Sequence, residues 1–248
     1  MLNQPTIQKL KEMRLPVMAN MLSDPTETEL EMTFEDRLAL MVENEWLARR
    51  NNRINRLLKK ASFPVAASIE NIDYEHQKGL DKKLIQNLAS CGYIEQHLNL
   101  IITGMTGSGK TYLASAFGNA ACRKNYTVRY LRIPELLLEL QTAKLENRYP
   151  KYLKQIQKLN LLILDDIGLK TYTLDESRDL LEIIEARYDN ASLIMIGQIP
   201  HPKWYELFSD PTIADAIMDR IIHNSYVFAI EAKQSMREVT AKRVMSDD

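Results

Sequence analysis

The chain has 248 residues and a mass of 28.7 kDa, which suits one α/β domain of ordinary size with a small appendage. Hydrophobic residues make up 45% and charged residues 26% of the sequence, and this composition excludes an intrinsically disordered chain. No apolar run approaches the roughly 20 residues that a membrane-spanning helix needs, and residues 1–12 contain no signal-peptide core. The net charge of −1 argues against a uniformly basic nucleic-acid binder but leaves room for a local basic patch.

The first 68 residues are expected to form a small all-α unit. Thr33 and Asp36 have the spacing of a capping box, and apolar residues recur at helical spacing from position 38 to position 58. Pro64 should end this long helix, and Pro16 should interrupt a shorter amphipathic helix upstream. Residues 69–80 are polar and are predicted to be the linker to a second domain, residues 69–248.

Beyond the linker, short apolar runs alternate with helical patterns. The runs predict strands at 98–103, 127–131, 159–164, 193–197 and 226–230. The helical patterns cover 111–123, 134–144, 151–158, 174–188 and a segment that ends near 222. Strands separated by helices pair in parallel through right-handed crossovers, so the fold class we predict is α/β, a three-layer parallel sheet.

The first helix of this domain follows a complete P-loop pattern, G-x-x-x-x-G-K-[ST]. Its glycines allow a tight turn whose N–H groups face phosphate oxygens, and the following helix adds the positive end of its dipole. Lys110 should reach the β- and γ-phosphates without any role in packing, and the Thr111 hydroxyl should bind Mg²⁺. The predicted nucleotide-binding residues are Gly104, Met105, Thr106, Gly107, Ser108, Gly109, Lys110, Thr111 and Tyr112.

A second motif agrees with an ATP site. The apolar run 161–164 ends in Asp165 and Asp166, as a Walker B strand does. We expect Asp165 to hold Mg²⁺ directly or through water, and Asp166 to polarise the attacking water. ATP and Mg²⁺ are therefore the predicted cofactors.

Two further polar residues are candidates for the reaction. Gln198 follows the strand at 193–197, and it is either a sensor of the γ-phosphate or an ordinary polar loop residue. Arg220 lies late in a helix that begins after Pro211, where an arginine finger for a neighbouring subunit is favoured over a simple helix-end cation. Arg187 and Arg237 are weaker finger candidates.

The predicted long helix carries a basic stretch without any acid between residues 46 and 60. Its members are Arg49, Arg50, Arg53, Arg56, Lys59 and Lys60. Arg49, Arg53, Arg56 and Lys60 recur at spacings of three or four and so share one helix face, which predicts binding to DNA phosphates without strong sequence preference. Two alternatives remain: an ordinary solvated face, and pairing with the acidic stretch that precedes it between residues 24 and 45.

Taken together, these motifs resemble the IstB-like helper ATPases of insertion sequences, relatives of the DnaC-type helicase loaders in the AAA+ class. The resemblance extends over nearly the whole chain. It rests on the P-loop and the Walker B strand, together with segments 45–51, 72–74, 79–81, 186–188, 198–200 with Trp204, and 219–220.

The resemblance implies an ATP-regulated protein that assembles on duplex DNA as a homo-oligomer and assists a partner transposase in target selection, in the cytoplasm and away from membranes. It places Arg220 at the arginine-finger position, Gln198 at the sensor position and residues 72–80 at the adenine side. The sequence departs from the family pattern in having Asp166 where Glu is usual and Gln198 where Asn is usual. We also expect no C-terminal lid after the last strand, so closure over the nucleotide would need a neighbouring subunit.

Other functions remain open on the sequence alone. A DnaC-like replicative helicase loader would share the same motor domain, and an assembly scaffold that hydrolyses ATP slowly is compatible with the shorter Asp166. A small-molecule P-loop kinase would need a lid with arginines that clamp phosphate, and the sequence offers none.

Overall fold

The computed structural model describes residues 4–74 and 77–232, and the chain divides into two compact units, Met1–Arg56 and Leu57–Asp248. The division lies within one long helix and earlier than residue 68, where we placed the domain boundary; that boundary stays a prediction.

No helix in the described part of the chain is long and apolar enough to cross a membrane. Residues 233–248 lie outside the described ranges. The prediction that no lid follows the last strand and the finger candidate Arg237 both fall on these residues.

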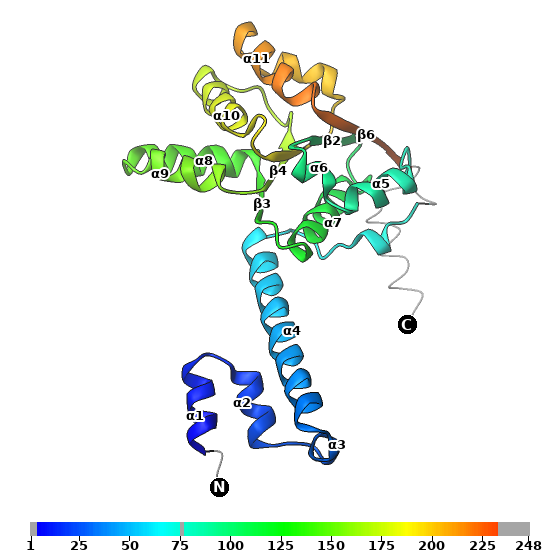
Figure 1. The fold of residues 1–248 in the computed structure, drawn as a ribbon. Helices are drawn as coiled ribbons and strands as arrows, with labels where there is room; N and C mark the ends of the chain where they lie inside the picture. Colours follow the sequence, from blue (N-terminus) through cyan, green and yellow to red (C-terminus); the bar gives the residue numbers. More distant parts are fainter. Residues whose placement is uncertain (1–3, 75–76, 233–248) are drawn as a thin grey trace, which may run out of the picture. The chain divides into compact units, whose positions relative to one another are not determined.

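The first unit is helical, as predicted (Figure 1). Its helices are α1 (Gln4–Glu12), α2 (Pro16–Ser23), α3 (Glu27–Glu31) and α4 (Phe34–Ala61). The backbone N–H of Asp36 donates to Thr33 Oγ1 at 3.2 Å, which confirms the predicted cap of α4. The short helix α3 was not expected, although Thr26 and Glu29 form a capping box of the same kind.

A buried carboxylate joins α4 to α2. Glu45 accepts hydrogen bonds from the backbone N–H groups of Val17 at 2.9 Å and Met18 at 3.3 Å, at the start of α2. Helix N-termini leave such N–H groups without partners in the helix, so an acid from another helix stabilises them. Glu45 also accepts from Arg49 Nε at 2.9 Å, so the same carboxylate binds both α2 and the next turn of α4.

The second unit contains a six-stranded sheet in the order β1-β6-β2-β5-β4-β3. Its strands are β1 (Gln77–Lys78), β2 (Asn99–Gly104), β3 (Val128–Arg132), β4 (Leu161–Ile167), β5 (Ser192–Gly197) and β6 (Ser225–Ala232). Strands β2 to β6 pair in parallel, which confirms the predicted parallel sheet. The two-residue strand β1 lies in the predicted linker and pairs antiparallel with β6 at the sheet edge.

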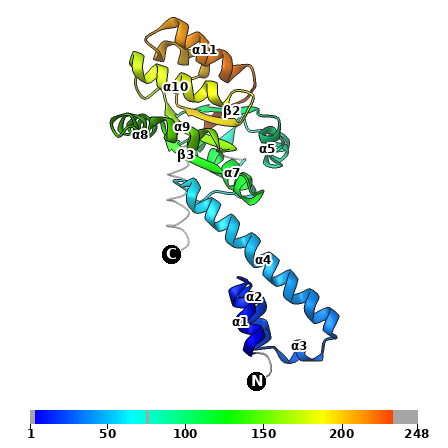
Figure 2. The ribbon, with the colours of Figure 1, turned by 60° about the vertical axis from the view of Figure 1, so that its left-hand side comes forward.

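Helices cover both faces of this sheet and complete the three-layer sandwich (Figures 1 and 2). They are α5 (Lys82–Ala89), α6 (Gly92–Glu95), α7 (Lys110–Arg123), α8 (Ile133–Leu145), α9 (Tyr149–Gln157), α10 (Leu174–Arg187) and α11 (Pro211–Ile222), with 3₁₀ turns η1 (Ile69–Asn71) and η2 (His201–Leu207). Helices α5 and α6 were not expected, although Asp81 caps α5 by accepting from the N–H of Lys83 at 2.8 Å.

The alternation of side chains along the strands produces two cores. Leu162 and Met195 contribute to the core under α8–α11, whereas Ile163 and Ile194 contribute to the core under α5–α7. All four side chains are buried, so the centres of β4 and β5 are apolar on both faces. The carboxyl ends of the parallel strands β2, β4 and β5 place the P-loop, Asp165, Asp166 and Gln198 at one edge of the sheet.

Candidate nucleotide-binding site and basic helix

The loop between β2 and α7 has a conformation that requires glycine. Gly104, Gly107 and Gly109 have φ values of 153°, 79° and 93°, a region that side chains with a Cβ rarely adopt. A Cβ atom on Gly104 would lie 2.4 Å from the backbone oxygen of Ile230 in the neighbouring strand β6. The loop geometry is therefore the one that the P-loop pattern predicts.

Lys110 is the first residue of α7 and is only 8% exposed. Its Nζ donates to the backbone oxygens of Gly104 and Met105, each at 2.7 Å. The ammonium group thus closes the loop on itself, in contrast to the expectation that Lys110 has no role in packing. A phosphate group that binds in the loop would compete with these two carbonyls for the ammonium.

Thr111 and Asp165, which we both predicted to bind Mg²⁺, lie together. Thr111 Oγ1 donates to Asp165 Oδ2 at 2.9 Å, which joins α7 to the end of β4. A hydroxyl and a carboxylate are hard oxygen ligands of the type that Mg²⁺ prefers, and Mg²⁺ usually takes its remaining ligands from phosphates and water. Among the described residues no group of three or more His, Cys, Asp or Glu could hold a metal by itself. The donor set therefore fits a metal that binds with a nucleotide.

Tyr130 on β3 also belongs to this site, and the sequence analysis missed it. Its phenol group donates a hydrogen bond to Asp165 Oδ2. Burial and the neighbouring Asp165 raise the pKa of Tyr130 well above its ordinary value, so the phenol stays protonated and remains a donor. Asp165 is thus held by hydroxyl donors from two sides.

Asp166 has a different environment from Asp165. Its φ is +67°, and the pairing of β4 with β5 shifts between Leu164 and Ile167. The Asp166 carboxylate forms an ion pair with Arg132 Nε at the end of β3. Asp166, which we expected to polarise water, is therefore paired with Arg132, a residue that no sequence motif marks.

The position of β5 between β2 and β4 brings Gln198 to the P-loop. Gln198 Oε1 accepts a hydrogen bond from Thr106 Oγ1 at 3.0 Å. Gln198 thus contacts the loop predicted to bind phosphate, although its role as a sensor stays a prediction. Tyr112 points the other way, since its phenol lies 3.5 Å from both the backbone N and the backbone O of Ser68, just before the linker.

Arg220 lies across the sheet from the P-loop, at the amino end of β2 and not at its carboxyl end. Its Nη2 donates to Glu185 Oε1 at 2.8 Å and its Nη1 donates to the Ala216 oxygen at 2.9 Å, with the side chain 26% exposed. It lines a small hollow with His97 and Asn99, next to the amino end of β2, whereas the P-loop follows the carboxyl end of that strand. Two ends of a six-residue strand are roughly 17 Å apart. Arg220 therefore lies far from the phosphate site of its own chain.

The weaker finger candidate Arg187 is part of the core. Its side chain is 1% exposed and donates to the backbone oxygens of Ile156 and Ser192, both at 2.8 Å. Burial lowers the pKa of Arg187 to about 10, so the guanidinium is still charged at neutral pH. These contacts tie α10 to the end of α9 and to β5, which is a structural role.

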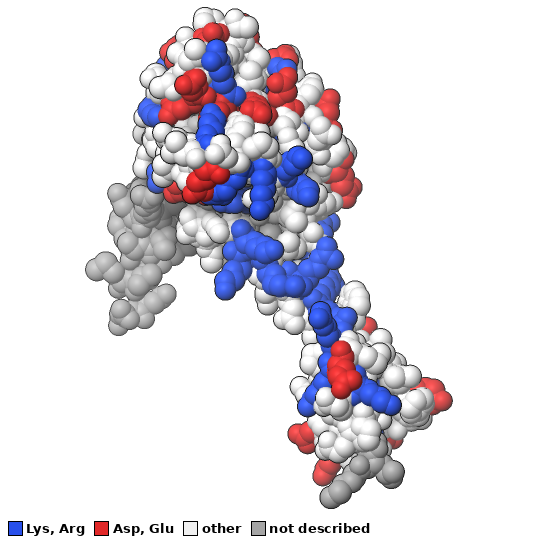
Figure 3. All heavy atoms as spheres, turned by 90° about the vertical axis from the view of Figure 1, so that its left-hand side faces the viewer, with Lys and Arg blue, Asp and Glu red and all other residues white. Residues whose placement is uncertain are grey.

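The six predicted DNA-binding residues are all exposed on α4, and Figure 3 shows Lys and Arg side chains gathered along this helix. Arg49 pairs with Glu45, and Arg50 lies 5.4 Å from the ring centroid of Trp46. Within residues 4–74 and 77–232, no acidic side chain forms an ion pair with Arg53 or any basic residue after it on α4. The preceding acidic stretch thus leaves most of the basic residues available to phosphate.

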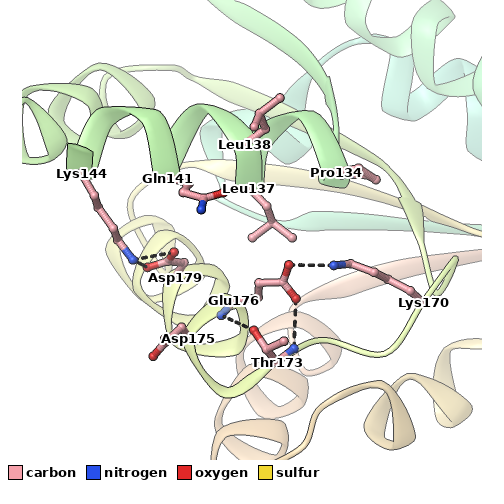
Figure 4. A pocket seen from close by; sticks show the side chains of 10 residues that line it. All are labelled: Pro134, Leu137, Leu138, Gln141, Lys144, Lys170, Thr173, Asp175, Glu176 and Asp179. Carbon is pink, nitrogen blue, oxygen red and sulfur yellow. Dashed lines mark hydrogen bonds and ion pairs between the residues drawn. The ribbon is translucent and has the colours of Figure 1, made fainter. Parts of the chain in front are cut away.

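A groove of about 470 Å³ lies between α8 and α10, away from the P-loop (Figure 4). Four of its charged side chains are paired with each other, Lys170 with Glu176 at 2.7 Å and Lys144 with Asp179 at 2.6 Å, whereas Asp175 lies 3.8 Å from Arg178. Figure 4 shows these pairs along its wall, with Leu137 opposite.

Comparisons with known proteins agree with this geometry. A family model described as IstB-like ATP binding protein matches residues 8–244. The chain is 36% identical over 245 residues to an insertion-sequence ATP-binding protein, y4pL of Sinorhizobium fredii, which covers 98% of this chain and 100% of that protein. It is 32% identical to the ATP-binding protein of insertion sequence IS232 from Bacillus thuringiensis subsp. berliner, with 89% of each chain covered.

The fold is also similar to solved structures. The crystal structure of DnaI has a TM-score of 0.59 at 22% identity and covers 71% of this chain and 94% of its own. The DnaC helicase loader has a TM-score of 0.58 at 20% identity, with 66% of this chain and 97% of its own covered. At these identities the similarity concerns the fold, and it supports the α/β P-loop architecture.

Proposed function

The chain belongs to the family of IstB-like ATP-binding proteins, and we propose that it is an ATP-hydrolysing, DNA-binding helper of transposition. In this proposal it assembles on duplex DNA under nucleotide control and assists a partner transposase in target selection. Relatives named as ATP-binding proteins of insertion sequences support the setting. The observation that carries the proposal is the placement of a complete phosphate site and a candidate arginine finger at opposite edges of one sheet.

In this proposal each residue of the phosphate site has a role. Lys110 exchanges its two carbonyl partners for phosphate oxygens, and Gln198 contacts the γ-phosphate side. Thr111 and Asp165 would hold Mg²⁺, which would neutralise charge on the phosphates. Asp166 polarises the attacking water, but its ion pair with Arg132 competes for the same carboxylate, so we expect slow basal hydrolysis.

The arginine finger acts between subunits in this proposal. Charge on the γ-phosphate oxygens is stabilised by a finger that contributes roughly 10³ to 10⁵ in rate. Because Arg220 lies at the far edge of its own sheet, a neighbour's Arg220 has to supply this charge. ATP should therefore favour oligomers, and turnover per subunit should rise with protein concentration.

A mixing experiment tests the assignment. Lys110→Ala and Arg220→Ala should each be nearly inactive, and a mixture of the two should recover turnover where an intact site meets an intact finger. Glu185→Gln is a matched control, because it releases Arg220 from its partner while keeping the guanidinium, and it should retain activity. No recovery in a mixture shown to co-assemble would remove Arg220 from the reaction in trans.

The basic residues of α4 are proposed to bind the DNA backbone. If all six contact phosphates, the slope of log affinity against log salt should approach about −5 per subunit. Arg53→Glu combined with Arg56→Glu should weaken binding to every duplex by a similar factor. The control is Lys151→Glu with Lys154→Glu, two exposed lysines on α9. A larger loss from the α9 pair would place the DNA surface on the ATPase unit.

A helicase loader is the second candidate, favoured by the similarity in fold to DnaI and DnaC. It shares the ATP site and differs in the partner protein. Capture of the purified full-length chain by a transposase encoded beside it, measured against capture by a replicative helicase, separates the two functions. Selective binding to the helicase would overturn the transposition proposal and leave the ATP site untouched.

A further inference from the structure

Asp165 accepts hydrogen bonds on both of its carboxylate oxygens. Oδ1 accepts from the backbone N–H of Asp166 at 2.7 Å, whereas Oδ2 accepts from Thr111 Oγ1 at 2.9 Å and from the phenol of Tyr130. The donors belong to β4 itself, to α7 and to β3, and Asp165 is only 6% exposed. The orientation of this carboxylate is therefore set by the protein.

Tyr130 is the one of these donors that belongs to no nucleotide-binding motif. Strand β3 pairs with β4 so that Tyr130 lies opposite Ile163, and Arg132 lies opposite Asp165. The Tyr130 side chain is part of the core under α5–α7, and its phenol oxygen reaches the Asp165 carboxylate. A phenylalanine ring would fill the same space, so packing alone does not explain the hydroxyl.

The three hydrogen bonds limit what Asp165 offers to a metal. A carboxylate has roughly four lone-pair positions, and three of those on Asp165 accept from the protein. Thr111 keeps its own lone pairs for the metal, because its hydroxyl donates the hydrogen to Asp165. Asp165 can therefore make one contact to a metal ion, or to a water on that ion, without losing a protein donor.

Mg²⁺ and Ca²⁺ differ in how they use such a carboxylate. Mg²⁺ requires near-octahedral geometry at about 2.0–2.1 Å and keeps several waters, so a single contact suits it. Ca²⁺ takes about six to eight oxygen ligands at longer distances and often binds both oxygens of one carboxylate. Binding through both oxygens of Asp165 would require Oδ2 to give up a hydroxyl donor.

We propose that Tyr130 is a positioning residue that holds Asp165 to one contact with the metal and thereby selects Mg²⁺ over Ca²⁺. This role rests on the proposed function, because it takes the P-loop, Thr111 and Asp165 as the site of the nucleotide and its metal. It places a determinant of metal choice on β3, a strand that carries neither the P-loop nor the Walker B motif.

Nucleotide binding with each metal tests this role without any turnover. The full-length chain is titrated with Mg²⁺ or with Ca²⁺ in the presence of a fluorescent ADP analogue, and the half-saturating concentration of each metal is measured. Wild type should need less Mg²⁺ than Ca²⁺. Tyr130→Phe keeps the ring and removes the hydroxyl, and it should narrow this preference by roughly tenfold, which is the scale of one hydrogen bond to an ionised group.

Tyr152→Phe is the matched control. Tyr130 and Tyr152 are both 7% exposed, and the Tyr152 phenol also donates to a carboxylate, Glu139 Oε2 at 2.7 Å, but in the core under α8–α11. The control variant should keep the metal preference of wild type. A purely structural role of the Tyr130 hydroxyl would change the half-saturating concentrations of both metals by the same factor. Circular dichroism checks that both variants keep their helices.

The outcomes separate the role of Tyr130 from the proposed function. An unchanged preference in Tyr130→Phe, or an equal narrowing in Tyr152→Phe, would overturn the role of Tyr130 and leave the ATP site supported by metal-dependent binding. A wild type that needs equal concentrations of Mg²⁺ and Ca²⁺ would overturn it as well, whatever the variants do. Binding of the analogue by wild type without any need for metal would overturn the proposed metal site itself, and the role of Tyr130 with it.

Discussion

Replacing Lys110 by methionine should affect both the empty protein and its response to ATP. The substitution keeps most of the aliphatic stem and removes the ammonium, which donates to the oxygens of Gly104 and Met105 at 2.7 Å. Hydrogen bonds from charged groups contribute roughly 1.5–3 kcal/mol each when fully buried, but the Met105 side of the loop is exposed and water replaces part of the loss. We expect the free energy of unfolding of the ATPase unit to fall by about 1–2 kcal/mol, which lowers Tm by roughly 2–8 °C.

The larger effect should appear with nucleotide. A ligand at 100 times its Kd stabilises the native state by about 2.7 kcal/mol, or roughly 5–10 °C for a domain of this size. Wild type should show this rise in Tm with Mg·ATP in differential scanning fluorimetry, and Lys110→Met should lose most of it. Lys124→Met is the control, since Lys124 donates to the Ser90 oxygen at 2.7 Å beyond the other end of α7. An unchanged ATP shift in Lys110→Met would refute the assignment of the phosphate site. An unchanged Tm without ATP would refute the structural role of the ammonium.

Three further predictions concern side chains around the sheet. Arg187→Met should lower the free energy of unfolding by about 3 kcal/mol in urea titrations, because two buried backbone oxygens lose a charged donor; a loss near zero would contradict this structural role. Asp166→Asn should keep Mg·ATP binding but abolish turnover. Arg132→Gln should raise basal turnover, because it removes the ion pair that holds the Asp166 carboxylate. Equal turnover in wild type and Asp166→Asn would exclude Asp166 from the reaction. Burial raises the pKa of Cys91 to about 11 and that of Cys122 to about 12. At pH 8 both thiols should therefore resist an aromatic disulfide reagent until urea unfolds the chain. Rapid reaction of the native protein would show that the thiols are accessible.

The sequence alone determined the features that depend on neighbouring residues in the chain. The P-loop is one of them, because its glycines, Lys110 and Thr111 are consecutive and the turn is set by their own φ values. The cap at Thr33 is another, since its hydrogen bond spans three residues. The parallel sheet was also predictable, because apolar runs separated by helical patterns leave few other arrangements. Helices α5 and α6 were missed, as they are short and precede the first recognised strand.

The tertiary structure decided the partners that come from distant parts of the chain. Tyr130 and Arg132 reach Asp165 and Asp166 only because β3 pairs with β4 in one register, and no local pattern specifies that register. The two arginines Arg187 and Arg220 look alike in sequence, each being near the end of a helix. Packing buries the first among backbone oxygens and leaves the second at the sheet edge opposite the P-loop. Local hydrogen bonds and backbone angles are encoded in a few adjacent residues, whereas strand order and burial depend on the free energy of the whole packed sheet.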